Sequence, residues 1–205
     1  MYLYNFVRGL LKIYFFQNLD VNKFIEAPIN KFNMELLEGI YTRRSIRKYK
    51  DEKLSDHQIH SLLKAGMQAP SAMNCQPWHF IVIREKNKLQ EIMNIHPYAQ
   101  MLKDADVAIL VLGDTKLEHG QGYWVVDCGA ATQNILLAAH GMGLGAVWIG
   151  IQPREARKEA FKELFNLPPH IMPFALVSVG FPAEEKPAVD RFAPGKVHYE
   201  EWKEK

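Results

Sequence analysis

Residues 105–113 read "ADVAILVLG", a nearly uninterrupted apolar run. Such a run is typical of a strand buried on both faces, because a strand with one wet face alternates apolar and polar residues. Working outward along the chain, three further apolar runs predict strands that surround this one in a central sheet. They cover residues 79–85, 145–150 and 172–182.

The longest helical candidate covers residues 123–141 and reads "YWVVDCGAATQNILLAAHG". It is apolar on nearly every side, which implies burial all round. A single small domain has little material with which to surround such a helix. We therefore expect this segment to lie at a subunit interface.

Shorter helices are predicted between the strands. Ser55 and Gln58 form a capping-box pattern ahead of apolar residues at helical spacing, which predicts a helix over residues 56–67. Other segments predict helices at residues 34–42, 86–94 and 153–166. Because strands alternate with helices, the pattern alone favours an α/β chain with a central sheet.

The composition is that of an ordinary globular domain, with 205 residues, 48% of them apolar and 23% charged. The net charge of +2 gives no electrostatic case for nucleic acid or an anionic membrane as the main partner. Cys75, Cys128 and the scattered histidines lack the spacing of a zinc site or a disulfide framework. We therefore expect a cytoplasmic protein without a metal centre.

Residues 1–33 precede the predicted domain, which we place at residues 34–205. The segment begins "MYLYNFVRGLLKIYFF", is too short to span a bilayer and has no small-residue cleavage site after it. An interfacial amphipathic helix, a partner-binding arm and a segment added by an early start codon all remain open. Its role is unknown, and no stable insertion into a membrane is expected.

A cluster of cations lies at residues 43–49, "RRSIRKY". Guanidinium groups match phosphate oxygens with forked donors, and a serine hydroxyl adds a neutral donor. Alternate residues of an extended chain share one side, so Arg43, Ser45 and Arg47 can converge on a phosphate monoester. Arg44 would then point elsewhere. The alternative is a basic turn that only faces water.

Two further stretches fit a flat, polar-edged ligand. Residues 70–80, "PSAMNCQPWHF", place Ser71, Asn74 and Gln76 in a loop whose side chains carry both donors and acceptors. Residues 143–150, "GLGAVWIG", contain glycines that permit close approach of the backbone to a ring. The glycine spacing is not that of a dinucleotide fingerprint, and the chain has no P-loop.

These three stretches, in this order, resemble the nitroreductase family of FMN-dependent NAD(P)H oxidoreductases. The resemblance covers about residues 34–203. It implies an α+β fold with a mixed central sheet flanked by helices and a long buried interface helix. It also implies a homodimer with FMN at the interface and NADH or NADPH as the reductant.

The resemblance assigns cofactor-binding roles to particular residues. Those at 43–47 would hold the phosphate and ribityl side of FMN, those at 70–74 would come from the partner subunit, and those at 150–151 would offer a backbone N–H near flavin N5. Gln100 stands near the place where many relatives carry a lysine beside the flavin pyrimidine, which leaves the redox potential open. The full set is Arg43, Arg44, Ser45, Arg47, Pro70, Ser71, Ala72, Asn74, Gln100, Gly150, Ile151 and Arg191.

The implied reaction needs no catalytic side chain, because FMN carries the chemistry. Hydride would pass from NAD(P)H to flavin N5 and then to a nitroaromatic, a quinone or a similar flat, electron-poor acceptor, with ping-pong kinetics. Relatives that dehalogenate or desaturate substrates generally use an added lid, for which residues 95–123 leave little room. A flavin storage or electron-relay protein without broad reductase turnover, and a protein that binds no flavin, are the remaining alternatives.

Overall fold

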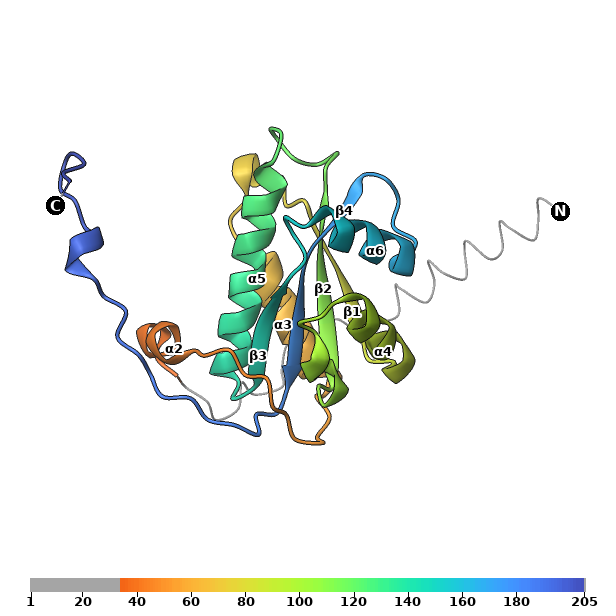
Figure 1. Cartoon of the computed structure of the whole chain (residues 1–205). Coiled ribbons are helices and arrows are strands. Elements are labelled where there is room, and N and C mark those ends of the chain that lie inside the picture. Colours follow the sequence, from red (N-terminus) through yellow and green to blue (C-terminus); the bar gives the residue numbers. More distant parts are fainter. Residues whose placement is uncertain (1–33, 205) are drawn as a thin grey trace. The chain divides into compact units, whose positions relative to one another are not determined.

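The computed structural model describes residues 34–204, so the extension at residues 1–33 lies outside the described part of the chain. The helices are α2 (Leu36–Thr42), α3 (Asp56–Met67), α4 (Lys86–Ile95), α5 (Tyr123–Gly141) and α6 (Glu155–Phe165). The strands are β1 (Trp78–Ile83), β2 (Val107–Asp114), β3 (Gly145–Gly150) and β4 (Ile171–Gly180). Three short 3₁₀ helices cover Ala72–Asn74, Gln100–Lys103 and Pro194–Lys196 (Figure 1).

The four strands form one sheet in the order β1-β2-β4-β3, and every neighbouring pair is antiparallel. The α+β class is therefore confirmed, whereas the α/β class that strand–helix alternation favours is wrong. The reason is that α4 and α6 each return the chain to the end of the sheet that it left, so the strands they join pair antiparallel. Helix α5 crosses from β2 to β3, which run in the same direction, but β4 lies between these two strands and pairs antiparallel with both. Among residues 34–204, the mixed character of the sheet comes from one isolated parallel bridge between Ser45 and Ala146.

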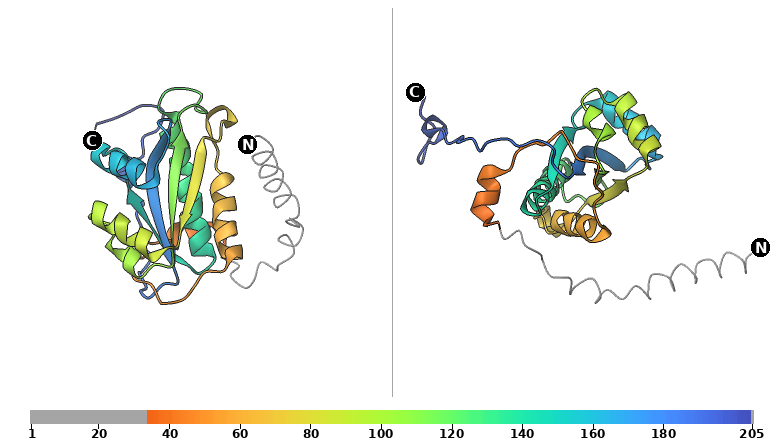
Figure 2. Two further views of the ribbon diagram at one scale, coloured as in Figure 1. Left: turned by 90° about the vertical axis from the view of Figure 1, so that its right-hand side faces the viewer. Right: turned by 90° about the horizontal axis from the view of Figure 1, so that it is seen from below.

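Helices cover both faces of the sheet. Helices α3 and α5 pack on one face and α4 and α6 on the other, as Figures 1 and 2 show. Every residue of β2 is buried, which confirms the strand predicted from the run at residues 105–113. Alternate residues of β2 enter the two separate apolar clusters, so this strand joins both halves of the core.

Helix α5 has the predicted bounds but buries only part of its surface within one chain. Trp124, Cys128 and Ile135 lie in the core between α5 and the sheet. Tyr123 and Val126 are 53% and 68% exposed, although both are large apolar residues. Among residues 34–204, the apolar surface near the start of α5 is therefore only partly covered.

Helix α3 begins at the predicted capping box. The Ser55 N–H donates to Gln58 Oε1 at 2.9 Å, and the Gln58 N–H donates to Ser55 Oγ at 3.2 Å. Both otherwise unpaired amides of the first turn thus find acceptors.

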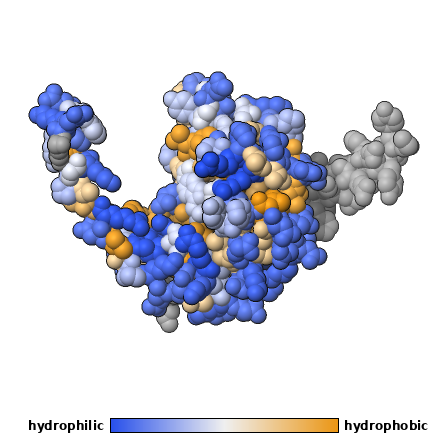
Figure 3. Space-filling model, in the orientation of Figure 1, coloured by the Kyte–Doolittle hydropathy of each residue, from blue (hydrophilic) through white to orange (hydrophobic). Residues whose placement is uncertain are grey.

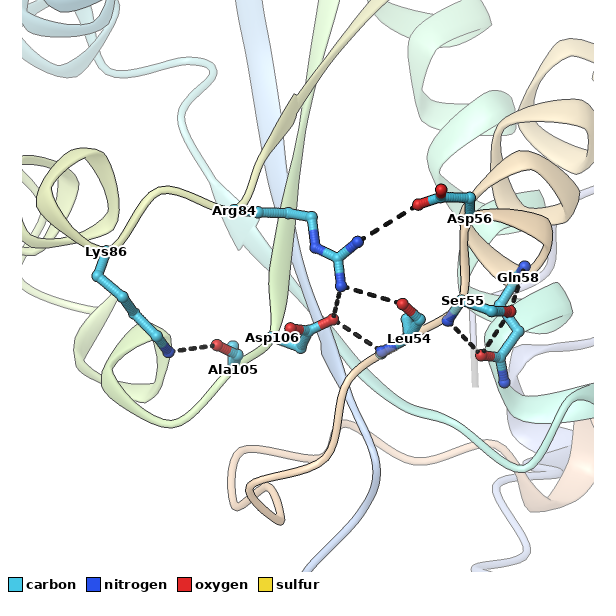
Figure 4. Close-up of polar contacts among 8 residues, drawn as sticks. All are labelled: Leu54, Ser55, Asp56, Gln58, Arg84, Lys86, Ala105 and Asp106. Atoms are coloured by element: carbon cyan, nitrogen blue, oxygen red, sulfur yellow. Dashed lines mark hydrogen bonds and ion pairs between the residues drawn. The ribbon is translucent and has the colours of Figure 1, made fainter.

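A polar network fixes the chain just before α3 (Figure 4). Arg84 Nη2 donates to the Leu54 carbonyl at 3.0 Å and to Asp106 Oδ2 at 2.9 Å. The same Asp106 oxygen accepts the Leu54 N–H at 2.8 Å. Since Arg84 follows β1 and Asp106 precedes β2, the network joins two strand ends to the start of α3. Arg84 Nη1 also lies 3.5 Å from the exposed carboxylate of Asp56.

Within residues 34–204, no helix combines the length and apolar character needed to cross a bilayer.

Candidate functional site

The cationic segment runs along the outer edge of β3. The Ile46 N–H donates to the Ala146 carbonyl at 3.0 Å, which forms the isolated parallel bridge. Tyr49 forms a second bridge, with Pro182, and its buried hydroxyl donates to the Ile46 carbonyl at 2.7 Å. Backbone pairing on both sides therefore holds the segment between them in place.

Arg47 lies in this segment, and its backbone N–H donates to Glu184 Oε1 at 2.6 Å. This hydrogen bond lowers the pKa of Glu184 below its ordinary value. The Arg47 side chain is exposed, and its guanidinium makes no ion pair with any residue between 34 and 204. It is thus a fixed cation available to an anionic ligand.

Arg47 lines a cavity of about 360 Å³ at the end of β3, which we call the edge cavity. Its lining is Arg47, His96, Tyr98, Gln100, Met101, Val147, Trp148, Ile149, Gly150 and Arg157. Three residues predicted to bind the cofactor therefore meet here, namely Arg47, Gln100 and Gly150. Trp148 is 37% exposed at this edge, and its ring packs against Phe174 at 5.4 Å between centroids.

The pairing of β3 determines which way Gly150 faces. The Ala146 carbonyl accepts from Ile46 outside the sheet, whereas the Ile151 N–H donates inward to Phe174 at 3.3 Å. Since the direction alternates along an antiparallel edge strand, the N–H and C=O of Gly150 point away from β4. Of the two residues predicted to offer an N–H, Gly150 faces outward, while Ile151 is buried and bonded to its own sheet.

Two side chains outside the predicted set meet at the Gly150 carbonyl. His96 Nε2 lies 3.0 Å from this oxygen, and Arg157 Nη1 donates to it at 2.9 Å. His96 is 1% exposed, and burial lowers its pKa below the ordinary value of 6.5. Arg157 also lies over the Tyr98 ring, 5.4 Å from the centroid. His96 and Gly150 are 54 positions apart, and no local pattern in the sequence links them.

The remaining arginines gather at a second cavity, of about 630 Å³, between α2 and the tail that follows β4. Arg44 and Arg191 line it. Burial, and then the nearby charges of Arg191 and Arg44, lower the pKa of Arg43. Neither Arg43 nor Arg191 forms an ion pair with a carboxylate in the part of the chain that the structure describes. This concentration of positive charge favours binding of an anion.

Arg44 has a different role within the chain. Its guanidinium donates to the carbonyls of Pro187 and Val189 in the tail and of Tyr41 and Arg43 near its own backbone. These four contacts occupy its donors. Arg44 therefore ties the tail to the end of α2, whereas Arg47 lines the edge cavity.

The loop at residues 70–76 lies apart from both cavities in the single chain. Met73, Asn74 and Gln76 have positive φ angles of 49°, 56° and 49°, which non-glycine residues rarely adopt. The Gln76 N–H donates to Ser71 Oγ, and Gln76 Nε2 donates to Asn74 Oδ1, both at 2.9 Å. Strained backbone that persists only through such contacts is common in segments that bind ligands.

Asp127 of α5 also holds this loop. Its Oδ1 accepts the Ala72 N–H at 3.0 Å. The other oxygen, Oδ2, is buried without a hydrogen-bond partner among the described residues. Asp127 and Ala72 are 55 positions apart, and no local pattern in the sequence links them.

Between residues 34 and 204, no three His, Cys, Asp or Glu side chains lie close enough together to hold a metal ion. The site contains guanidinium groups without ion-pair partners among the described residues, such as that of Arg47. It also contains the outward-facing N–H of Gly150 and the partly exposed ring of Trp148.

Comparison with known proteins identifies this arrangement. The family profile described as "Nitroreductase family" matches residues 40–181. A Methanothermobacter thermautotrophicus protein with the provisional name NADH dehydrogenase/NAD(P)H nitroreductase is 47% identical over 186 residues, covering 91% of this chain and 96% of that one.

Solved structures of similar proteins support the same family. A protein of the same provisional name from Parabacteroides distasonis superposes with a TM-score of 0.78 at 40% identity, covering 82% of this chain and 98% of that one. A protein from Desulfovibrio desulfuricans, provisionally named a nitroreductase and solved in complex with FMN, superposes with a TM-score of 0.72 at 33% identity, covering 82% and 98%. This chain belongs to the nitroreductase family.

Proposed function

We propose that this chain is an FMN-dependent oxidoreductase that takes electrons from NADH or NADPH and passes them to flat, electron-poor acceptors such as nitroaromatics or quinones. FMN, when bound, supplies the hydride transfer through its N5 atom. The chain itself contributes binding, orientation and electrostatics. The observation that carries the proposal is the meeting of Arg47, Gln100 and Gly150 at one cavity in a chain of this family.

The donor set fits the phosphate of FMN. Arg43, Arg47 and Arg191 have guanidinium groups without carboxylate partners among residues 34–204. Burial, and then the repulsion of Arg191 and Arg44, disfavour the charged form of Arg43 and lower its pKa. A phosphate dianion relieves this repulsion and accepts paired hydrogen bonds from a guanidinium fork. The Desulfovibrio relative, which carries FMN in its structure, supports the same ligand class here.

The edge cavity fits one side of a flat ring. Gly150 presents its backbone at an edge with no side chain, and a Cβ built there would meet only the Gln152 carbonyl at 3.8 Å. Gln100 lines the same cavity, although its Nε2 also donates to the Met93 carbonyl at 3.2 Å. The cavity is open on one side, so a nicotinamide and an acceptor could occupy that side in turn. Shared occupancy of this kind predicts ping-pong kinetics.

We further propose that the chain acts as a homodimer in which the loop at residues 70–76 completes the partner's flavin site. The support is uncovered apolar surface on α2, α5 and the tail. Leu36, Val126, Phe192 and Trp202 are 72%, 68%, 74% and 76% exposed, and pairing with a second copy would bury such side chains. Figure 3 shows apolar residues in orange at the surface of the face that carries α5.

The test is the absorbance spectrum of the purified protein followed by anaerobic reduction with each nicotinamide. We expect flavin absorbance bands that bleach with NADH or NADPH and return on addition of menadione or a nitrofuran. Bound flavin without steady-state turnover would favour the storage or relay alternative. A colourless protein that takes up no FMN would contradict the proposal.

A further inference from the structure

The backbone carbonyl of Gly150, at the end of β3, makes two contacts that the proposed function does not use. The outward carbonyl of Gly150 receives two hydrogen bonds, one from His96 and one from Arg157. The first donor follows α4 and the second lies on α6. Two elements from the same side of the sheet thus converge on one atom of an edge strand.

The tautomer of His96 follows from its second contact. The Tyr98 N–H donates to His96 Nδ1 at 3.2 Å, so Nδ1 is an acceptor and carries no proton. Neutral imidazole then carries its proton on Nε2, which donates to Gly150. The ring is 1% exposed and lies edge-on to Phe161, so its orientation is fixed by packing as well.

Arg157 supplies the second donor, and a contact with a neighbouring ring also restrains its side chain. Its guanidinium lies over the Tyr98 ring, and its Nη1 reaches the Gly150 carbonyl. Tyr98 therefore contacts both donors, one through its backbone N–H and one through its ring. Arg157 is the charged group that faces His96 within the described residues, and its charge disfavours the protonated imidazole.

Glycine needs such an anchor more than other residues. Without a Cβ, glycine can rotate the peptide plane that follows it over a wide range, so the orientation of the Gly150–Ile151 peptide at the end of β3 depends on its hydrogen bonds. On the outer side of β3, no further strand pairs with Gly150 in the described sheet. Two hydrogen bonds to its carbonyl restrict that rotation.

We propose that His96 and Arg157 are positioning residues, which by jointly donating to the Gly150 carbonyl hold the Gly150–Ile151 peptide and keep the end of β3 in the position from which the Gly150 N–H faces the edge cavity. This inference rests on the proposed function, in which that N–H donates to N5 of FMN. Oxidised N5 accepts a hydrogen bond, whereas reduced N5 carries a hydrogen. Loss of the positioned donor therefore weakens binding of oxidised FMN and raises the midpoint potential.

The experiment uses protein labelled with [¹⁵N]glycine, in which the Gly150 amide signal is assigned by its absence in Gly150→Ala. His96→Phe removes the donor and keeps a buried ring, while His96→Gln keeps an N–H near the place of Nε2. Arg157→Met and Arg157→Lys form the matching pair on α6. Lys162→Met, on the same helix and paired with Glu159, is the control for loss of a cation.

We expect His96→Phe and Arg157→Met to shift or broaden the Gly150 amide signal in the FMN-free protein. With FMN, each should raise Kd about tenfold, as expected for one lost hydrogen bond, and raise the midpoint potential. His96→Gln, Arg157→Lys and Lys162→Met should stay close to the parent protein. Because Arg157 is partly exposed, its pair remains informative if His96→Phe does not fold.

The inference is overturned if folded His96→Phe and Arg157→Met both leave the Gly150 signal and the potential unchanged. It is also overturned if the donor-keeping variants are as impaired as the donor-free ones. Failure of the proposed function is distinct, since the parent protein would then bind no FMN. The amide signal in FMN-free protein would still decide whether the two side chains orient Gly150.

Discussion

The carboxylate of Asp127, in the second turn of α5, accepts the backbone N–H of Ala72 at 3.0 Å. This hydrogen bond joins the long helix to the loop that we expect to reach the partner's flavin. The loop contains three non-glycine residues at positive φ, so contacts from outside must hold its shape.

We predict that Asp127→Ala lowers the free energy of unfolding by about 1–3 kcal/mol, because it leaves the partly buried amide of Ala72 without an acceptor. FMN binding should weaken as well, since the loop is no longer held in its binding conformation. Asp127→Asn keeps an acceptor oxygen and replaces the unpaired Oδ2, so it should behave like the parent protein. Urea denaturation and FMN titration measure both effects. Equal behaviour of the Ala and Asn variants would contradict the role given to Asp127.

Arg47 provides the most direct test of the anion site. Arg47→Ala should weaken FMN binding by about 1–3 kcal/mol, the range for loss of a hydrogen bond to a charged group. Lys48→Ala removes the same charge one residue away, outside the edge cavity, and should change FMN binding by less than about 0.5 kcal/mol. Fluorescence titration measures both. Equal losses in the two variants would show a diffuse charge effect rather than a specific contact.

For the polar network shown in Figure 4, we predict the effect of two substitutions on the free energy of unfolding. The Asp106 side chain is 8% exposed and accepts from both Arg84 and Leu54. Asp106→Ala should cost about 2–4 kcal/mol of unfolding free energy, because it strands a partly buried guanidinium and a backbone amide.

Asp56→Asn is the matched control, since it removes the other, 95% exposed partner of the same guanidinium. It should cost less than about 1 kcal/mol. Thermal or urea unfolding measures both variants. If Asp56→Asn lowered the free energy of unfolding as much as Asp106→Ala, the claim that the buried carboxylate contributes more than the exposed one would be contradicted.

From His96 and His140, we predict how the free energy of unfolding varies with pH. Burial, as the largest cause, lowers the pKa of both His96 and His140 below the ordinary value of 6.5. The unfolded chain therefore binds more protons than the folded one when the pH falls below 6.5, so acid destabilises the fold. The stability is fully present above this pH and declines as the pH falls toward the folded pKa values.

Urea midpoints measured between about pH 7.5 and about pH 5.5 should fall with pH, across the range in which an ordinary histidine titrates. His140→Gln, and His96→Gln where it folds, should each reduce the slope, because the Thr42 contact of His140 and the Gly150 contact of His96 do not need a titrating ring. A slope unchanged in the double variant would contradict the assignment.

Much of the fold is readable from local sequence. The capping box at Ser55 and Gln58 places the start of α3, and the apolar run within residues 105–113 identifies β2. Helix α5 has its predicted bounds of 123 and 141. Strand direction is different, because it depends on which distant strands pair. Alternation of strands and helices therefore favoured the wrong class, and the family resemblance supplied the right one.

The site is only partly readable in the same way. Residue type and spacing indicated Arg47 and Gly150, and family resemblance added Gln100, and the fold brings all three to one cavity. His96 and Asp127 were missed, because each acts through a backbone group 54 or 55 positions away. The roles of Pro70, Ser71, Ala72 and Asn74 in a partner's site stay predictions.

Equilibrium titration of the FMN-free protein with FMN, combined with sedimentation of the same samples, tests the central claim most directly. We predict saturable binding of one FMN per chain to a species with twice the mass of the chain, and weaker binding of FMN in Arg47→Ala but not in Lys48→Ala. A folded protein that sediments as a single chain and binds no FMN would contradict the account.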